Sequence, residues 1–453
     1  MTLIETPPPV TPAVGWTFPT YTERRLDNGL RVLRYDCPGQ YVVAATVLFD
    51  LPLTAEPPEL EGVAGLVGRC LTRGAAGRTA EEFADALALC GADLDASAFP
   101  DGFAVRLAVP MINLDKALRL MADAIRSPEF YDDEFDHEKD LRLEEIEQAA
   151  AYPQHVAVEQ LNGALFGDHR AARPVGGTAE SVTAVSRDDA VAFAQGHLDP
   201  ERATLIIAGD FAGLDPVALI AEAFEGWAGS APPTAADATP PPVPADHAQV
   251  ILVDWPTAPQ STLRLAAPGI TRGDARWAGL FAANFTIGGT FSSRINTVLR
   301  EEKGFTYGAG SSLDTGRDAG LITVSTAVRA DSTAEALGDI VTILRAATGS
   351  ITDDEVSTAA RAATESAALG FERADSVVGR VELLVSQGLP LDHVDTNLER
   401  IRRVTAGEAN SALETTLRPD AFTVVVVGDA ASLREPLAEW GYAPVVEVTP
   451  TRR

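Results

Sequence analysis

Residues 198–210 read Leu-Asp-Pro-Glu-Arg-Ala-Thr-Leu-Ile-Ile-Ala-Gly-Asp, and residues 417–429 read Leu-Arg-Pro-Asp-Ala-Phe-Thr-Val-Val-Val-Val-Gly-Asp. The two stretches share Leu, Pro, Thr, Gly and Asp at corresponding positions, with an offset of 219 residues. Between the Thr and the Gly, each carries an apolar run of the same length. This match indicates an internal repeat, the sequence signature of a chain built from copies of one structural unit.

A second match supports the repeat. Asp132-Asp133-Glu134 begins a helical pattern in the first half of the chain, and Asp353-Asp354-Glu355 begins another at an offset of 221 residues. Two independent matches at nearly the same offset are difficult to attribute to chance. The sequence therefore predicts two homologous α/β domains of the α+β class, each with a largely antiparallel sheet flanked by helices.

The joint between the two copies is predicted from composition. Residues 229–247 are rich in Ala and Pro and have little hydrophobic periodicity, which is typical of a semi-rigid extended linker. We therefore expect an N-terminal extension at 1–20, a first domain at 21–228 and a second domain at 248–453.

Local patterns in the first copy are consistent with this fold. Asp27-Asn28-Gly29 predicts the turn of a hairpin over residues 24–36. Thr79 and Glu82 form a capping-box pattern that begins a helix, and Gly91 would end it. Further expected elements are strands at 41–49, 93–98 and 103–109 and helices at 114–125 and 133–151.

The composition is that of an ordinary soluble globular protein, with 46% hydrophobic and 22% charged residues. The formal net charge of -29 argues against nucleic acid and anionic membranes as partners. Such acidity would favour basic peptides if it lined a cavity, whereas the simpler interpretation is surface charge that maintains solubility. No apolar run reaches the roughly 20 residues needed to span a bilayer, and no signal peptide is recognised, so a cytoplasmic protein is expected.

Cysteine usage excludes two classes of site. The chain has three cysteines, Cys37, Cys70 and Cys90, which are widely spaced and form no CxxC pair. This pattern argues against a disulfide framework and against a thiolate zinc site.

Residues 61–74 read Glu-Gly-Val-Ala-Gly-Leu-Val-Gly-Arg-Cys-Leu-Thr-Arg-Gly. This stretch resembles the signature helix of the pitrilysin/insulinase (inverzincin) metallopeptidases, in which a similar Glu-Gly-Val/Leu-Ala start leads into H-x-x-E-H. Positions i, i+3 and i+4 share one face of a helix. In that family two imidazoles can therefore hold zinc while the glutamate acts as base on the metal-bound water.

The zinc-binding residue types are missing from this motif. The three positions hold Gly65, Gly68 and Arg69; a glycine has no donor side chain, and a guanidinium repels a metal cation. The resemblance places the family's third ligand at Glu145 and a second acidic position at Glu138. We read these two as remnants on a solvated or chamber-facing helix stripe, and expect no metal cofactor in this chain. A site built from His137, His155 and His169 is the alternative.

The resemblance continues in the second copy. Residues 288–294 read Gly-Gly-Thr-Phe-Ser-Ser-Arg, and residues 298–307 read Val-Leu-Arg-Glu-Glu-Lys-Gly-Phe-Thr-Tyr. In active members of the family, an Arg and a Tyr seven residues apart face the zinc domain across a closed chamber, and Arg300 and Tyr307 match both the identities and the spacing. The resemblance implies that they bind a substrate carbonyl and the oxyanion. The alternative is that Arg300 caps a helix end or pairs with Glu301 or Glu302.

These observations lead to one functional hypothesis and two alternatives. In the family a catalytic unit needs four such domains, and this two-domain chain resembles the non-zinc subunit of heterodimeric bacterial members and of mitochondrial processing peptidase. We expect it to form half of a clam-shaped peptidase chamber with a homologous H-x-x-E-H subunit, which would supply the zinc, and to act on peptides. One alternative is a non-catalytic peptide-binding or scaffold homodimer, and the other is a hydrolase with an unrecognised site.

Overall fold

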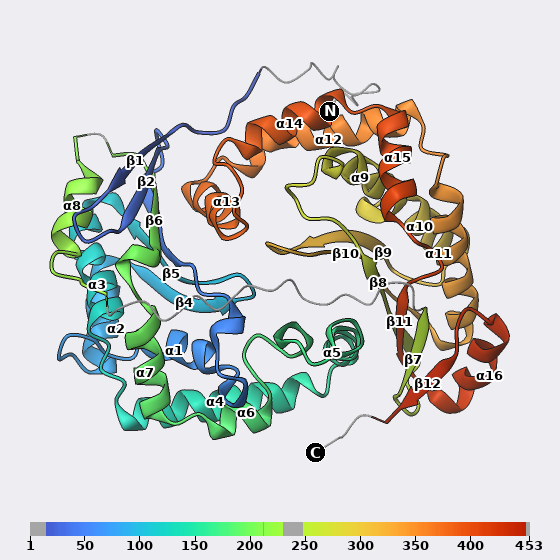
Figure 1. The fold of residues 1–453 in the computed structure, drawn as a ribbon, viewed down its shortest axis with the longest axis horizontal. Helices are drawn as coiled ribbons and strands as arrows, with labels where there is room; N and C mark the ends of the chain where they lie inside the picture. Colours follow the sequence, from blue (N-terminus) through green and yellow to red (C-terminus); the bar gives the residue numbers. More distant parts are fainter. Residues whose placement is uncertain (1–14, 212, 230–247, 450–453) are drawn as a thin grey trace, which may run out of the picture.

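The computed structural model describes residues 15–211, 213–229 and 248–449. Within these residues the chain forms two six-stranded sheets, each flanked by helices (Figure 1). The strand order is β1-β2-β6-β3-β5-β4 in the first sheet and β12-β7-β11-β8-β10-β9 in the second. The first sheet takes its strands from the first half of the chain and the second sheet from the second half.

The elements of the first half are these. The strands are β1 (Tyr21–Arg25), β2 (Arg31–Asp36), β3 (Val42–Phe49), β4 (Asp93–Phe99), β5 (Gly102–Pro110) and β6 (Ala203–Gly209). The helices are α1 (Val63–Leu71), α2 (Ala80–Cys90), α3 (Leu114–Arg126), α4 (Asp132–Ala149), α5 (Pro153–Phe166), α6 (Ala179–Ala184), α7 (Arg187–His197) and α8 (Pro216–Ala223).

The second half repeats this pattern of elements. The strands are β7 (Gln249–Asp254), β8 (Gln260–Pro268), β9 (Ala309–Thr315), β10 (Gly320–Arg329), β11 (Thr423–Gly428) and β12 (Val445–Val448). The helices are α9 (Trp277–Asn284), α10 (Arg294–Asn296), α11 (Thr333–Ala347), α12 (Asp353–Gly370), α13 (Ala374–Ser386), α14 (His393–Arg403), α15 (Ala406–Thr416) and α16 (Ala430–Trp440), and two wider helical turns occupy η6 (Phe285–Gly289) and η7 (Thr297–Glu302).

The internal repeat is confirmed by the topology. The order β2-β6-β3-β5-β4 corresponds strand for strand to β7-β11-β8-β10-β9. The repeated sequence runs form β6 and β11, which lie at equivalent positions and are each parallel to one neighbour and antiparallel to the other. The sheets are therefore largely antiparallel, as predicted. The edge strands differ, because β1 joins β2 antiparallel while β12 joins β7 parallel.

The local predictions in the first half are also confirmed. The hairpin of β1 and β2 turns at residues 27–29. Thr79 and Glu82 form both bonds of a capping box, and Gly91 ends α2 in the left-handed conformation. Such caps satisfy backbone groups that the helix itself leaves without partners, which is why these residue types mark its ends.

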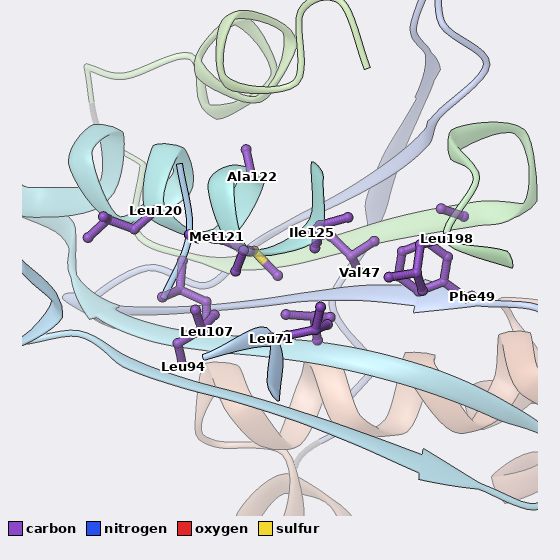
Figure 2. Close-up of a cluster of buried hydrophobic side chains, with 14 of the residues drawn as sticks. Val47, Phe49, Leu71, Leu94, Leu107, Leu120, Met121, Ala122, Ile125 and Leu198 are labelled. Atoms are coloured by element: carbon purple, nitrogen blue, oxygen red, sulfur yellow. The ribbon is translucent and has the colours of Figure 1, made fainter. Parts of the chain in front are cut away.

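One face of each sheet is covered by helices of the same half. In the first half, Val47 and Leu107 of the sheet belong to the same buried cluster as Leu120, Met121 and Ile125 of α3. Figure 2 shows these α3 side chains pointing toward the strands. Side chains alternate between faces along a strand, so the remaining residues of β2, β3 and β6 need a different cover.

That cover comes from the other half of the chain. Helix α13 packs on β3 and β6, with Val377 and Val381 in one cluster with Tyr35 and Ile206. Reciprocally, α5 packs on β8 and β11 of the second sheet (Figure 1). Both faces of the central strands are thereby covered, and each half supplies one helix to the core of the other. The two halves are joined by this exchange as well as by ion pairs such as Arg317 with Asp50.

The predicted domain limits are consistent with the elements but remain a proposal. The elements around the first sheet begin at Tyr21, and those around the second sheet begin at Gln249. Of the proposed linker, residues 230–247 lie outside the described residues, as do residues 1–14 of the proposed extension. No helix in the described parts of the chain is long and apolar enough to cross a bilayer.

Candidate functional site

Helix α1 carries the motif that resembles the zinc-binding signature, and a buried carboxylate fixes its first turn. Gly62 precedes the helix in the left-handed conformation, with φ of 99°. Glu56 Oε1 accepts hydrogen bonds from the backbone N–H groups of Gly62 and Ala64, each at 3.0 Å. Glu56 is itself held by Arg170, whose Nε donates to Glu56 Oε2 at 2.8 Å. A negative charge at this end of a helix is favourable because the backbone N–H groups there are unpaired.

Arg69 on α1 lies between the two acidic residues that the sequence singled out on α4. Its Nη2 donates to Glu145 Oε1 at 2.6 Å and also contacts Glu145 Oε2, while its Nη1 donates to Glu138 Oε2 at 3.3 Å. The structure therefore brings Arg69, Glu138 and Glu145, the positions that the family resemblance singled out, into direct contact. The positive centre between these carboxylates is a guanidinium.

Glu138 and Glu145 are expected on a solvated or chamber-facing helix stripe; they differ in exposure, and Glu138 lines the cleft beside α1. The side chain of Glu138 is only 2% exposed, whereas that of Glu145 is 46% exposed. Arg73 supplies a second cation, with its Nε donating to Glu138 Oε1 at 2.6 Å. The sequence did not single out Arg73, which lies just beyond the end of α1 at Leu71 and is part of no recognised motif. Two arginines thus neutralise one buried carboxylate.

The electrostatics of the cluster follow from these contacts. Burial opposes the charged form of Glu145, but hydrogen bonds from Arg69 and then Arg142 outweigh it and hold the pKa of Glu145 below its ordinary value. Burial likewise acts to lower the pKa of Arg69, but Glu145 and Glu138 together raise it. The neighbouring Cys70 thiol has its pKa raised to about 12 by burial and then by Glu138, so it is protonated at neutral pH and is a poor nucleophile or ligand.

The remaining motif positions face a cleft of about 450 Å³ between α1, α4 and β4. Gly68 lies against the strand: a Cβ built there would come within 2.7 Å of the Ala96 carbonyl oxygen. A Cβ on Gly65 would be 3.6 Å from Gly176 Cα, an ordinary contact. Gly68 therefore permits a close approach of helix and strand that any larger side chain would disturb.

The second pair singled out by the sequence lies on the other half of the molecule. Arg300 is on η7, its Nη1 donates to Glu301 Oε1 at 2.8 Å, and its guanidinium carbon lies 4.0 Å from the centre of the Phe291 ring. The surface ion pair weighed as the alternative for Arg300 is thus present. Phe291 is 66% exposed, which is unusual for a large apolar side chain.

Tyr307 follows η7 in the segment that leads to β9. Its side chain is 92% exposed. The adjacent Thr306 and Gly308 are hydrogen-bonded to each other, and Thr326 of β10 donates to both. The backbone is therefore anchored to the sheet while the phenol faces solvent. In the part of the chain that the structure describes, no hydrogen bond connects Arg300 to Tyr307, or either residue to α1 or α4.

Comparison with protein families covers both halves of the chain. Residues 31–179 match the sequence model described as Insulinase (Peptidase family M16), and residues 184–363 match the model described as Peptidase M16 inactive domain. The chain belongs to peptidase family M16. This membership agrees with the duplicated fold and with the place of the glycine- and arginine-substituted motif on α1.

Several M16 relatives span most of the chain. An uncharacterised zinc protease of Mycobacterium leprae is 29% identical over 417 residues, which cover 90% of this chain and 91% of the relative. One from Bacillus subtilis is 25% identical and covers 83% and 92% of the two chains.

Solved structures share the fold. An M16 inactive-domain structure from Pseudomonas fluorescens has a TM-score of 0.82 at 22% identity and covers 90% of this chain and 98% of that one. A protease from Helicobacter pylori has the same TM-score at 19% identity, covering 91% and 100%. A chain of complex III2 from Candida albicans has a TM-score of 0.75 at 15% identity, covering 94% and 100%.

The residues of this M16 chain do not fit the family's zinc ion. Gly65 and Gly68 carry no donor atoms, and the Arg69 guanidinium occupies the space between the carboxylates. Among the described residues, no group of three or more His, Cys, Asp or Glu side chains is arranged to hold a metal, and the alternative site from His137, His155 and His169 does not form.

Proposed function

We propose that this chain is the non-zinc subunit of an M16 metallopeptidase that degrades or processes peptides. It would pair with a homologous subunit that carries an intact H-x-x-E-H motif, zinc and base. Its own contribution would be half of the peptide chamber together with Arg300 and Tyr307. In this role Arg300 would bind a substrate carbonyl, and the Tyr307 phenol would donate a hydrogen bond to the oxyanion formed at the scissile bond.

The exposure of Tyr307 is the observation that carries the proposal. A phenol that is 92% exposed on a backbone anchored by Thr326 is available to another surface. At the cleft beside α1, by contrast, Glu138 and Glu145 are already paired with Arg69. The contrast between the paired carboxylates at α1 and α4 and the exposed phenol of Tyr307, beside a half-buried Arg300, favours action on a site in another chain.

Replacing Tyr307 by Phe tests the role of the phenol. The variant should lower the kcat of the reconstituted pair by roughly 10²-fold, as for the loss of one oxyanion donor, with little change in pairing. Arg300→Ala should lower kcat/KM in the same assay. Arg329→Ala is a control on the same half, because Arg329 is exposed and pairs with Asp331. Unchanged turnover in both Arg300→Ala and Tyr307→Phe would contradict the proposal.

A second candidate function is peptide binding or scaffolding without catalysis, as a homodimer. Two observations favour it. The guanidinium of Arg300 is already occupied by Glu301 and Phe291, and a largely apolar cavity of about 750 Å³ lies between the two halves, lined by Leu53 and Phe166 of the first half and Leu321 and Leu383 of the second.

This second function predicts binding without turnover. A purified homodimer should bind fluorescent apolar peptides in the presence of a chelator, and Leu383→Asp should weaken that binding while Tyr307→Phe leaves it unchanged. Metal-dependent cleavage that appears only with an H-x-x-E-H partner would instead favour the first proposal.

A further inference from the structure

A cavity of about 260 Å³ in the second half is lined by two arginines and a histidine among mostly apolar side chains. It lies between α9, α12, α13 and α14. Arg272 enters it from the segment after β8, Arg380 from α13 and His393 from the first position of α14. The chain has 65 acidic and only 36 basic residues, so two arginines without an acidic partner are unexpected in it.

The two arginines have no acidic partner. Neither Arg272 nor Arg380 forms an ion pair or a side-chain hydrogen bond with any residue that the structure describes. Both contact ring faces instead: the Arg272 guanidinium carbon lies 4.7 Å from the centre of the Trp277 ring, and that of Arg380 lies 5.2 Å from the centre of the Phe371 ring. A ring face positions a guanidinium but accepts few of its five N–H donors.

Buried donor and acceptor atoms at the cavity are left unsatisfied. Arg272 Nε and His393 Nε2 are both buried without a hydrogen-bond partner among the described residues, and His393 as a whole is 7% exposed. Buried polar atoms in native proteins nearly always have a partner, so these two atoms are available to a ligand, an ion or a water molecule in the cavity.

The electrostatics of the cavity indicate which charge a ligand would carry. Burial and then the charge of Arg380 lower the pKa of Arg272 to about 10, and burial lowers the pKa of Arg380. Burial also lowers the pKa of His393; Arg272, Arg400 and Arg380 add to this, and Asp392 opposes it. His393 is therefore neutral at pH 7, while both arginines stay charged. A partly buried charge without a counter-ion is unfavourable, and an anion would relieve it.

We propose that this cavity binds a small organic anion whose oxyanion head, a carboxylate or a phosphate, pairs with Arg272 and Arg380. The planar guanidinium matches either head through two parallel N–H···O bonds. The other walls include Phe281, Leu398 and Ile401, which suit an apolar or aromatic body on the ligand. The inference is independent of the proposed pairing, because these residues lie away from both α1 and η7.

Ligand binding to the full-length chain tests the inference by thermal unfolding and calorimetry. The probes are phenyl phosphate, benzoate and inorganic phosphate, each compared with sodium chloride of the same ionic strength because phosphate stabilises many proteins non-specifically. We expect a saturable rise in Tm of roughly 3 °C at a hundredfold excess over Kd for at least one aromatic anion. Preference for phenyl phosphate or for benzoate would identify the head group. No rise beyond the salt control for all three probes would overturn the proposal.

Variants separate a built site from general anion binding. Arg380→Gln should lower the affinity for the preferred anion at least tenfold, since it removes a charge-assisted hydrogen-bonded pair. Arg380→Lys should have an affinity between those of Arg380→Gln and the native chain, because lysine keeps the charge but lacks the two parallel N–H donors of a guanidinium. Arg403→Gln is the matched control, being an exposed arginine on α14 that pairs with Glu399, and should bind as the native chain does. Because the Arg380 side chain forms no ion pair with the described residues and only a ring contact with Phe371, Arg380→Gln without ligand should change Tm little. Equal affinity in Arg380→Gln and the native chain would overturn the proposal.

Discussion

The cleft at α1 and the surface at η7 use arginine in opposite ways. In the cleft, Arg69 is held by Glu138 and Glu145, and the buried carboxylate receives a second cation from Arg73. At η7, Arg300 has one exposed carboxylate neighbour and lies on an exposed ring. The first arrangement is a self-contained ionic core that stabilises the fold, whereas the second leaves side chains available to another molecule. In this M16 chain, loss of the zinc ligands is accompanied by internal neutralisation of the remaining acids.

The largest expected difference between the two regions is in stability. Arg69→Ala should destabilise the chain by about 3 kcal/mol, because it leaves the buried Glu138 with only Arg73 and removes a bridge between α1 and α4. Arg300→Ala should change stability by less than about 1 kcal/mol, as for an exposed pair and a surface ring contact. Urea unfolding monitored by circular dichroism measures both. Equal effects would remove the distinction between a structural arginine and an available one.

A smaller effect is expected from the packing of α1. Gly68→Ala should destabilise by about 2 kcal/mol because its Cβ would meet the Ala96 carbonyl at 2.7 Å. Gly65→Ala is the matched control; it has room for a Cβ and should be neutral or stabilise by up to about 1 kcal/mol.

The same packing affects attempts to restore the zinc motif. Gly65→His, Gly68→Glu and Arg69→His together should fail to bind zinc tightly, because the glutamate at position 68 displaces β4. Zinc binding would be measured by calorimetric titration. Tight binding with an unchanged Tm would contradict this prediction and would show that β4 can move to accommodate the larger side chain.

The smallest expected effect is on acid stability. The pKa of Glu145 is lower in the folded chain than its ordinary value of 4.5. Its pairing with Arg69 therefore contributes stability above that pH, and the contribution is lost as the pH falls through the lowered value. In Glu145→Gln, the free energy of unfolding should fall less steeply below pH 4.5 than in the native chain. The difference should be under about 1 kcal/mol, as is typical of a half-exposed ion pair. Glu59→Gln, an exposed glutamate outside any ion pair of the described residues, should not alter the slope.

The fold could be predicted because its strongest signals are local and duplicated. The runs that became β6 and β11, and the caps of α2, act through neighbouring residues and need no knowledge of distant contacts. The exchange of α5 and α13 between the halves could not be predicted, because a helix pattern reveals an apolar face without identifying the sheet that covers it.

The site was predictable to the extent that its spacing was known. The family resemblance relates the positions of Arg69 and Glu145, which are 76 residues apart, and their side chains are in contact in the structure. The burial of Glu138 and the tight contact of Gly68 depend on how closely α1 approaches α4 and β4, which the sequence does not encode locally. The cavity of Arg272, Arg380 and His393 gathers residues from three separate segments and has no motif at all.

If this chain needs a zinc-bearing homologue to act, purification of the tagged chain from its source cells should recover that homologue. The attached proteins would be identified by mass spectrometry and their stoichiometry measured by native mass spectrometry. We expect an M16 homologue of similar length with an intact H-x-x-E-H motif, recovered at about one copy per chain. Recovery of this chain only with itself would contradict the account and would favour the non-catalytic homodimer.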